Sequence, residues 1–167
     1  MSDKKEKEEI FFKSLNYQFL TAESAMKICN FAKEKGEKEL ILKGLEIAEQ
    51  KFKEKSFSHF RVTKLIFMIE NFEIYKKDFL ILLQQTISDH RSSNFVLEEK
   101  DRIRLYQKLW NLSISFFNHS SFSIQDSSTL WFERCSSLLS SDEYFEKAKC
   151  YRLISSIKIK IKNNLIL

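Results

Sequence analysis

Proline is absent from this 167-residue chain, and glycine occurs only at Gly36 and Gly44. Average usage would give about eight prolines and about twelve glycines in a chain of this length. Proline breaks helix interiors and glycine loosens them, whereas a sandwich or barrel needs turn residues between its many strands. The sequence therefore predicts an all-α protein whose helices are joined by short turns.

Apolar residues recur at helical spacing in segments that are separated by short polar joints. We expect about eight helices, over residues 3–19, 21–36, 37–55, 58–72, 78–90, 98–118, 123–139 and 142–157. Helices of this length with short joints are typical of stacked antiparallel helical hairpins, as in a tetratricopeptide (TPR) α-solenoid. Residues 1–167 are expected to form a single domain of this TPR-like kind.

The last ten residues depart from the helical pattern. The stretch Ile157-Lys-Ile-Lys-Ile-Lys162 alternates with a period of two, which is typical of a strand. We expect residues 158–167 to be a frayed tail of the helical domain.

The net charge of the chain is +5, and most of this excess lies in residues 101–167, where ten Lys and Arg stand against six Asp and Glu. Charges of both signs are interspersed, as on an ordinary solvated helical surface. A nucleic-acid-binding domain usually has a pI above about 9. The pI of this chain is about 9.0, which is only borderline. Direct nucleic-acid binding is therefore not expected, although a helical module that binds nucleic acid through its basic C-terminal part stays an alternative.

Sorting signals and cysteines indicate the compartment. The first nine residues are too charged for a signal peptide, and the longest apolar run, Phe79-Leu-Ile-Leu-Leu83, is far short of a membrane span. Cys29, Cys135 and Cys150 are odd in number and widely scattered, which fits a reducing compartment. We expect a soluble intracellular protein with no membrane association.

No pattern of catalytic or metal-binding residues is present. The histidines, His59, His90 and His119, stand about thirty residues apart, and none has a second histidine or a cysteine at metal spacing. Two isolated glycines cannot build a phosphate-binding loop. The sequence predicts a protein that is not an enzyme and that holds no metal or cofactor.

Both tryptophans of the chain lie in the segment of residues 109–140. Trp110 and Phe117 are seven residues apart and project from the same face of a helix, Phe122 follows in the turn, and Trp131 comes from the next helix. The TPR signature places a tryptophan and a later aromatic residue at similar offsets, although Asp126 stands where a small residue is expected. We expect these aromatic side chains to pack between antiparallel helices and not to line a site.

The same segment resembles one particular TPR family. Leu109-Trp110-Asn111, then Phe117, Phe122 and Trp131, and then Ala148-Lys149 and Arg152 resemble the meiosis-specific TPR scaffold of the synapsis-initiation (ZMM) group, which is needed for sporulation in yeast. The resemblance covers residues 80–155 and is best over residues 105–155. It implies that Leu109, Trp110, Asn111, Phe117, Phe122, Trp131, Ala148 and Arg152 are the packing residues that define a repeat.

The resemblance implies a protein–protein interaction scaffold. Its members act on meiotic chromosomes in the nucleus, where they promote crossover formation and synaptonemal complex assembly, and their partners are crossover and chromosome-axis factors. Members are long solenoids, so this chain is expected to be a fragment of such a protein or a shortened form. The alternative is a generic TPR-like adaptor in another process.

Overall fold

The computed structural model describes residues 2–18, 20–52, 57–92 and 96–166. These residues form eight helices and no strand, which confirms the predicted all-α class. The chain divides into two compact units, Met1–Phe67 (unit 1) and Met68–Leu167 (unit 2), and the boundary between them falls within the fourth helix.

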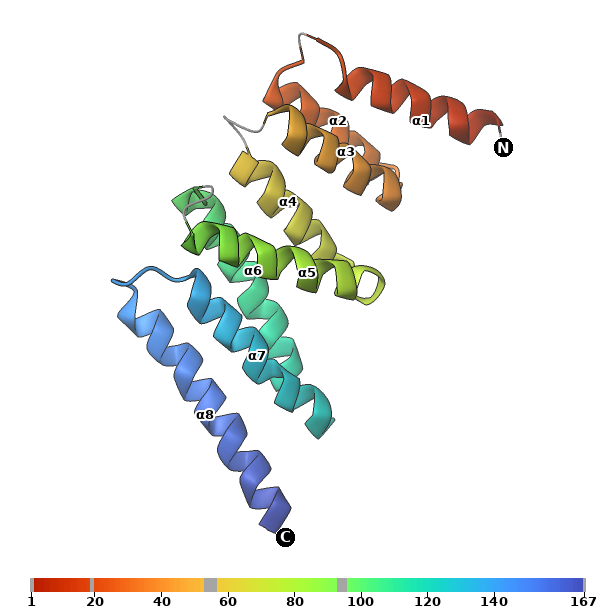
Figure 1. Ribbon diagram of the computed structural model, residues 1–167. Coiled ribbons are helices and arrows are strands. Elements are labelled where there is room, and N and C mark those ends of the chain that lie inside the picture. The colour runs from red at the N-terminus through yellow and green to blue at the C-terminus, as the bar shows by residue number, and fades with distance from the viewer. Residues whose placement is uncertain (1, 19, 53–56, 93–95, 167) are drawn as a thin grey trace. The chain divides into compact units, whose positions relative to one another are not determined.

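Unit 1 contains α1 (Ser2–Leu15), α2 (Ala22–Glu34), α3 (Lys38–Lys51) and most of α4 (Phe57–Glu70). Helices α2 and α3 lie side by side and antiparallel, and α1 packs against both of them (Figure 1). The described residues of unit 1 thus include one helical hairpin with a further helix placed on it.

The ends of α2 are set by two residues that the sequence marks clearly. Thr21 precedes the helix, and its hydroxyl accepts a hydrogen bond from the backbone N–H of Ser24 at 3.2 Å, as an N-cap does. Gly36 follows the helix with φ +74°, a left-handed conformation that only glycine adopts easily. The chain can therefore reverse within three residues and enter α3.

The α2–α3 contact of unit 1 is formed by small and aliphatic side chains, and the rings of Phe11 and Phe60 are also buried in this unit. The buried residues at the contact are Ala25, Cys29 and Ala32 from α2, and Ile41, Gly44, Leu45 and Ala48 from α3. At Gly44 the ring of Phe11 from α1 comes so close that an added Cβ would lie 2.7 Å from it. A buried ion pair, Arg61 Nε to Glu49 Oε1 at 2.6 Å, connects α4 to α3.

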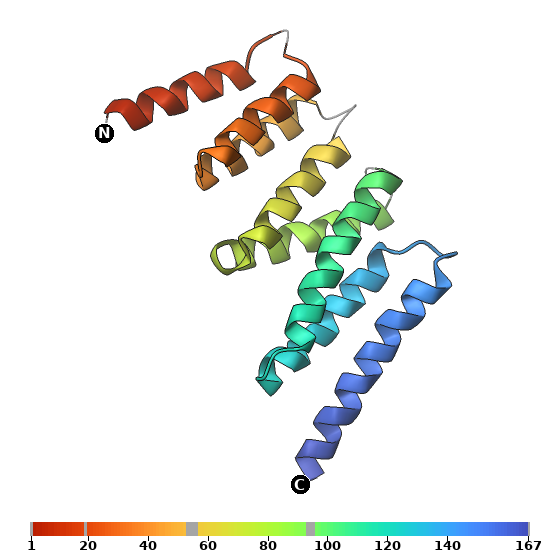
Figure 2. The same ribbon diagram turned by 180° about the vertical axis from the view of Figure 1, so that it is seen from behind.

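Unit 2 contains the end of α4 and the helices α5 (Phe72–Arg91), α6 (Glu99–Phe117), α7 (Phe122–Leu138) and α8 (Tyr144–Ile166). Helix α7 lies antiparallel to α6 on one side and to α8 on the other (Figures 1 and 2). Helix α5 crosses α6 in Figure 1, and its Phe72 and Phe79 contact Trp131 of α7. Unit 2 therefore presents three long helices in succession, with α7 in the middle.

The predicted frayed tail is wrong over the described residues, because α8 continues to Ile166. Ile157 is buried and Ile161 is half-buried, and these two residues are one helical turn apart on the same face. Ile159, which falls between them in the alternating pattern, projects away and is exposed. Helical contacts with α7 thus outweigh the strand-like alternation of isoleucine and lysine.

Candidate interaction groove of unit 2

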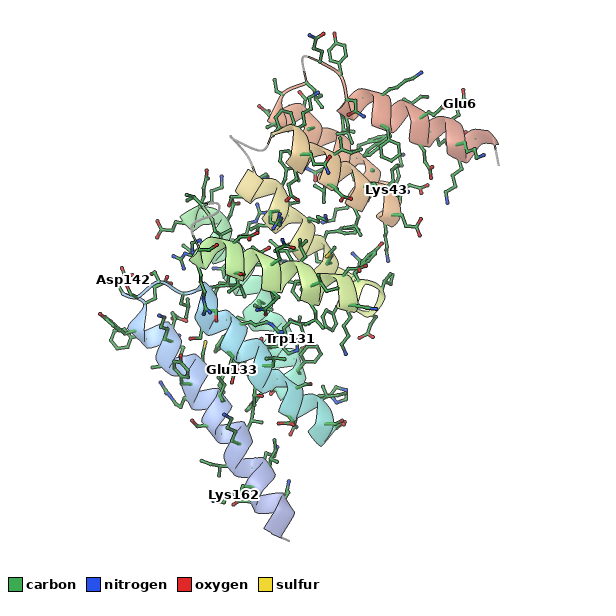
Figure 3. All side chains as sticks on the ribbon, in the orientation of Figure 1. Glu6, Lys43, Trp131, Glu133, Asp142 and Lys162 are labelled. Carbon is green, nitrogen blue, oxygen red and sulfur yellow. The ribbon has the colours of Figure 1, made fainter. Side chains whose placement is uncertain are left out.

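Trp131 packs at the meeting point of three helices. Only 4% of its surface is exposed, and its ring stacks on Phe79 of α5 at 5.7 Å between centroids. Phe72 of α5 meets it edge-on at 5.7 Å, and Phe116 of α6 lies at 6.0 Å. Trp131 is labelled in Figure 3 on α7. The prediction that it is a packing residue is confirmed.

Trp110 has a different environment from Trp131. Its ring meets Phe132 of α7 edge-on at 5.3 Å and lies 6.2 Å from Tyr106 of its own helix. One side of the ring is covered by α7, and the side chain remains partly exposed. Trp110 therefore packs as predicted, and it also forms part of a surface.

The other residues expected to define a repeat fall into three groups. Leu109 is fully buried, and Phe117 is half-buried with its ring 6.4 Å from Phe132. The side chain of Phe122 lies outside the described residues. The prediction is wrong for the remaining three, which are exposed: Asn111, Ala148 and Arg152. These three lie on the faces of α6 and α8 that turn away from α7, so no neighbouring helix of unit 2 covers them.

A shallow groove of about 330 Å³ lies between α6 and α8. Helix α6 supplies four of the groove's lining residues and α8 supplies two: Tyr106, Gln107, Trp110 and Asn111 from α6, and Glu146 and Lys149 from α8. The α6 residues form two adjacent pairs, 106 with 107 and 110 with 111, and the pairs are one helical turn apart, which places all four on one face of the helix. The groove thus combines two aromatic rings, two side-chain amides and one pair of opposite charges.

A hydrogen bond connects α6 to α8 at the groove, and a second within α8 holds its acceptor. The Tyr106 hydroxyl donates to Glu146 Oε2 at 3.1 Å, and the other oxygen of Glu146 accepts from Lys149 Nζ at 3.0 Å. Burial raises the pKa of Tyr106 well above its usual range, and the negative charges of nearby groups raise it further. The hydroxyl therefore stays protonated and keeps its donor role toward α8.

The end of the groove region is fixed by Arg102 of α6. Its Nη1 donates to the carbonyl oxygen of Leu138 at 3.1 Å and to Glu143 Oε1 at 2.6 Å, which joins α6 to the turn between α7 and α8. Burial alone would raise the pKa of Glu143, but hydrogen bonds from Ser140 and the charge of Arg102 lower it overall. Glu143 is therefore ionised at neutral pH, and the turn is held by a charge-assisted hydrogen bond.

The three cysteines are buried, and Cys150 lies beneath the groove, where its thiol interacts with the Tyr106 side chain. Burial raises the pKa of Cys29 to about 11, of Cys135 to about 12 and of Cys150 to about 11. At neutral pH all three are thiols, which are poor nucleophiles compared with thiolates. Within the described residues, no three His, Cys, Asp or Glu side chains gather as they would around a metal ion.

Sequence reasoning singled out two of the six groove residues, for a different role. It named Trp110 and Asn111 as packing residues, included Lys149 only within the resemblance, and assigned no role to Tyr106, Gln107 or Glu146. The spacing of residues 106, 107, 110 and 111 shows that they share a face. Only the position of α8 beside that face shows that the face lines a groove.

No protein-family model, curated protein or solved structure matches this chain. Among the described residues, no helix combines the length and the apolar character needed to cross a membrane.

Proposed function

We propose that this protein is a non-enzymatic protein–protein interaction module that holds an extended peptide segment of a partner in the α6–α8 groove. The observation that supports this proposal is the combination of Tyr106 and Trp110 with the exposed amides of Gln107 and Asn111 in one groove.

Each part of the groove matches a need of peptide recognition. Aromatic side chains with a partly covered face are frequent energetic anchors of protein interfaces. Amide side chains both donate and accept hydrogen bonds, as the backbone of an extended peptide also does. A volume of about 330 Å³ is at the lower end for ligand pockets, so it suits a few residues of a peptide.

The groove is held in place before any partner arrives. The hydrogen bond from Tyr106 to Glu146 and the contacts of Arg102 with Leu138 and Glu143 fix α8 relative to α6. A rigid groove loses little conformational freedom when a ligand binds, which favours affinity.

A selection from a random peptide library on the purified chain tests this proposal. Selected peptides should lose at least tenfold in affinity on Gln107→Ala/Asn111→Ala, because both amides then lose their hydrogen bonds to the peptide. The matched control is Gln84→Ala/Gln85→Ala, which removes two exposed amides from α5 of the same unit. Equal loss in both double variants would refute a role for the groove.

The resemblance of residues 105–155 to the meiotic TPR scaffold supports a more specific proposal about the process. On this proposal the partners are crossover and chromosome-axis factors, the protein acts in the nucleus, and it promotes chromosome synapsis. Affinity purification from meiotic and from growing cells of the source organism tests it. Recovery of the same partners from both states would contradict a meiosis-specific role and leave the adaptor function of the groove in place.

A further inference from the structure

The positive charge of this protein is concentrated on its last described helix. Helix α8 carries six Lys and Arg residues and a single acidic residue, Glu146, which is a net charge of +5. The whole chain also has a net charge of +5, so the charges of all other residues cancel. The sequence alone showed an excess of only +4 spread over residues 101–167, because the five Asp and Glu of residues 101–143 outnumber the four Lys and Arg there by one.

Helix α8 contacts α7 with one face and leaves the opposite face uncovered within unit 2. The contacting face carries the buried Cys150, Ile154 and Ile157. The opposite face, which we call the outer stripe, is exposed and consists of Phe145, Ala148, Arg152, Ser155, Ile159 and Lys162. Lys162 is labelled near the end of α8 in Figure 3.

The composition of the outer stripe is that of a helix-packing surface. Its members are spaced alternately three and four residues apart, which is the spacing of a seam between two helices. Phe145 is 86% exposed and Ile159 is 60% exposed, so both offer apolar area for burial. Ala148 and Ser155 lie between these larger residues, and small side chains let a second helix approach closely.

We propose that the outer stripe of α8 docks an acidic amphipathic helix of a partner protein. Phe145 and Ile159 enter the apolar face of that helix, and Arg152 and Lys162 pair with carboxylates along its edges. Burial of apolar anchors spaced along a helix supplies affinity in this mode of recognition, and opposite charge supplies specificity and speed of association. This inference concerns a surface other than the groove and does not depend on the function proposed for the groove.

The charge of α8 and the direction of its lysines favour this occupant over three others. A second copy that paired α8 with α8 would bring +5 against +5. Nucleic acid needs a continuous basic stripe, but Lys149, which pairs with Glu146, and Lys160, which contacts Gln125 of α7 at 3.3 Å, both lie outside the outer stripe. A membrane-surface helix needs a broad apolar face, whereas this stripe has Arg152 at its centre.

The test uses the full chain and a labelled synthetic helix with leucine on one face and glutamate on the other. We expect it to bind the wild-type chain, and we expect Arg152→Glu/Lys162→Glu to reduce the affinity on the order of tenfold or more. Phe145→Ser/Ile159→Ser should cause a similar loss, which separates a packed interface from simple charge attraction. Lys13→Glu/Lys43→Glu is the matched control, because it reverses two exposed lysines of unit 1 and should leave binding unchanged.

A charge exchange makes the test decisive. A second helix with lysine in place of glutamate should bind the Arg152→Glu/Lys162→Glu variant more tightly than it binds the wild-type chain. Equal affinities of the control and stripe variants for the acidic helix would overturn the proposal. So would stripe-dependent binding of duplex DNA or of phosphatidylserine vesicles without binding of the acidic helix, or a dimer in sedimentation that the stripe variants abolish.

Discussion

The α2–α3 contact of unit 1 and the α6–α7 contact of unit 2 are filled by different side chains, although unit 1 also buries Phe11, Phe60 and Phe67. In unit 1 the α2–α3 hairpin closes over alanine, glycine and cysteine side chains, and Phe11 of α1 rests on Gly44. In unit 2 aromatic rings fill the contacts, with Trp131 against α5 and α6 and with Phe132 against Trp110 and Phe117. The helices of unit 2 are also longer, with 17 to 23 residues in α5–α8 against 13 or 14 in α1–α3.

This difference explains why the groove lies in unit 2. Small side chains let helix backbones approach closely, as at the α2–α3 contact. Large planar rings keep helices apart, and a ring at the margin of the contact stays partly open. Trp110 is such a ring, covered by α7 on one side and open to the α6–α8 groove on the other.

The distribution of tryptophan and cysteine lets each unit be followed separately. Trp110 and Trp131 both belong to unit 2, so tryptophan fluorescence reports its unfolding. Cys29 is the cysteine of unit 1, whereas Cys135 and Cys150 belong to unit 2. Residue-specific thiol labelling therefore measures how readily each core opens.

The largest effect is expected from Trp131→Ala. The substitution leaves a cavity between Phe79, Phe72 and Phe116, and we expect it to lower the free energy of unfolding of unit 2 by about 4 kcal/mol. Urea denaturation followed by the fluorescence of the remaining Trp110 measures this loss. Tyr151→Ala on the exposed face of α8 is the control and should change stability by less than about 0.5 kcal/mol. A similar small change for Trp131→Ala would contradict the aromatic core of unit 2.

A somewhat smaller effect is expected from Arg61→Met in unit 1. Glu49 is 7% exposed, and loss of the guanidinium at 2.6 Å leaves its carboxylate buried without that charge partner. We expect a loss of about 3 kcal/mol, measured as faster labelling of Cys29. Arg61→Met/Glu49→Leu should recover most of the loss, because both charges are then removed. If the double variant is no more stable than Arg61→Met, the ion pair is not the cause.

Gly44→Leu tests the close contact between α1 and α3. An added Cβ already meets the Phe11 ring at 2.7 Å, so the larger side chain must displace α1 and should destabilise unit 1 by about 2 kcal/mol. Circular dichroism during urea denaturation follows this loss. Lys43→Leu adds the same side chain to an exposed position of α3 and should be nearly neutral. Comparable losses at both positions would show that packing at Gly44 is not tight.

The smallest expected effect is the pH dependence of the free energy of unfolding that each cysteine thiol contributes. Unfolded thiols ionise near their ordinary pKa of 9.0, whereas the folded pKa is raised to about 11 for Cys29 and Cys150 and to about 12 for Cys135. The stabilisation from these protonated thiols is complete below pH 9 and is lost as pH rises toward 11 or 12, at about 1.4 kcal/mol per pH unit for each thiol. Cys29→Ala should remove one thiol's share of this slope from unit 1 between pH 9 and 10. An unchanged slope would mean that the thiol is not shielded.

The fold could be predicted from the sequence where the signal is local. The absence of proline gave the class, Thr21 and Gly36 marked both ends of α2, and Trp131 was assigned correctly to the core. The start of α5 was missed by six residues, because the joint before it is the single residue Asn71, which is neither proline nor glycine. The prediction for the tail was wrong because the alternation of residues 157–162 is a weaker determinant of structure than the packing of Ile157 and Ile161 on the face of α8 that contacts α7.

The groove could be predicted only in part, because it depends on which helix lies beside α6. A helical face such as that of residues 106–111 has the same pattern whether another helix buries it or leaves it open. Ala148 and Arg152 were expected to be packing residues because the family resemblance implied that role, and not because of a pattern on α8. Their spacing identifies a face of α8, but the position of α7 decides which face is covered.

The most direct test of the central claim, that the α6–α8 groove binds a peptide segment, uses single-tryptophan proteins. Trp131→Phe leaves Trp110 at the groove as the only tryptophan, and Trp110→Phe leaves Trp131 in the core. A peptide selected on the wild-type chain should change the emission of Trp110 in a saturable manner and leave that of Trp131 unchanged. Saturable binding that leaves the emission of Trp110 unaltered would contradict the account.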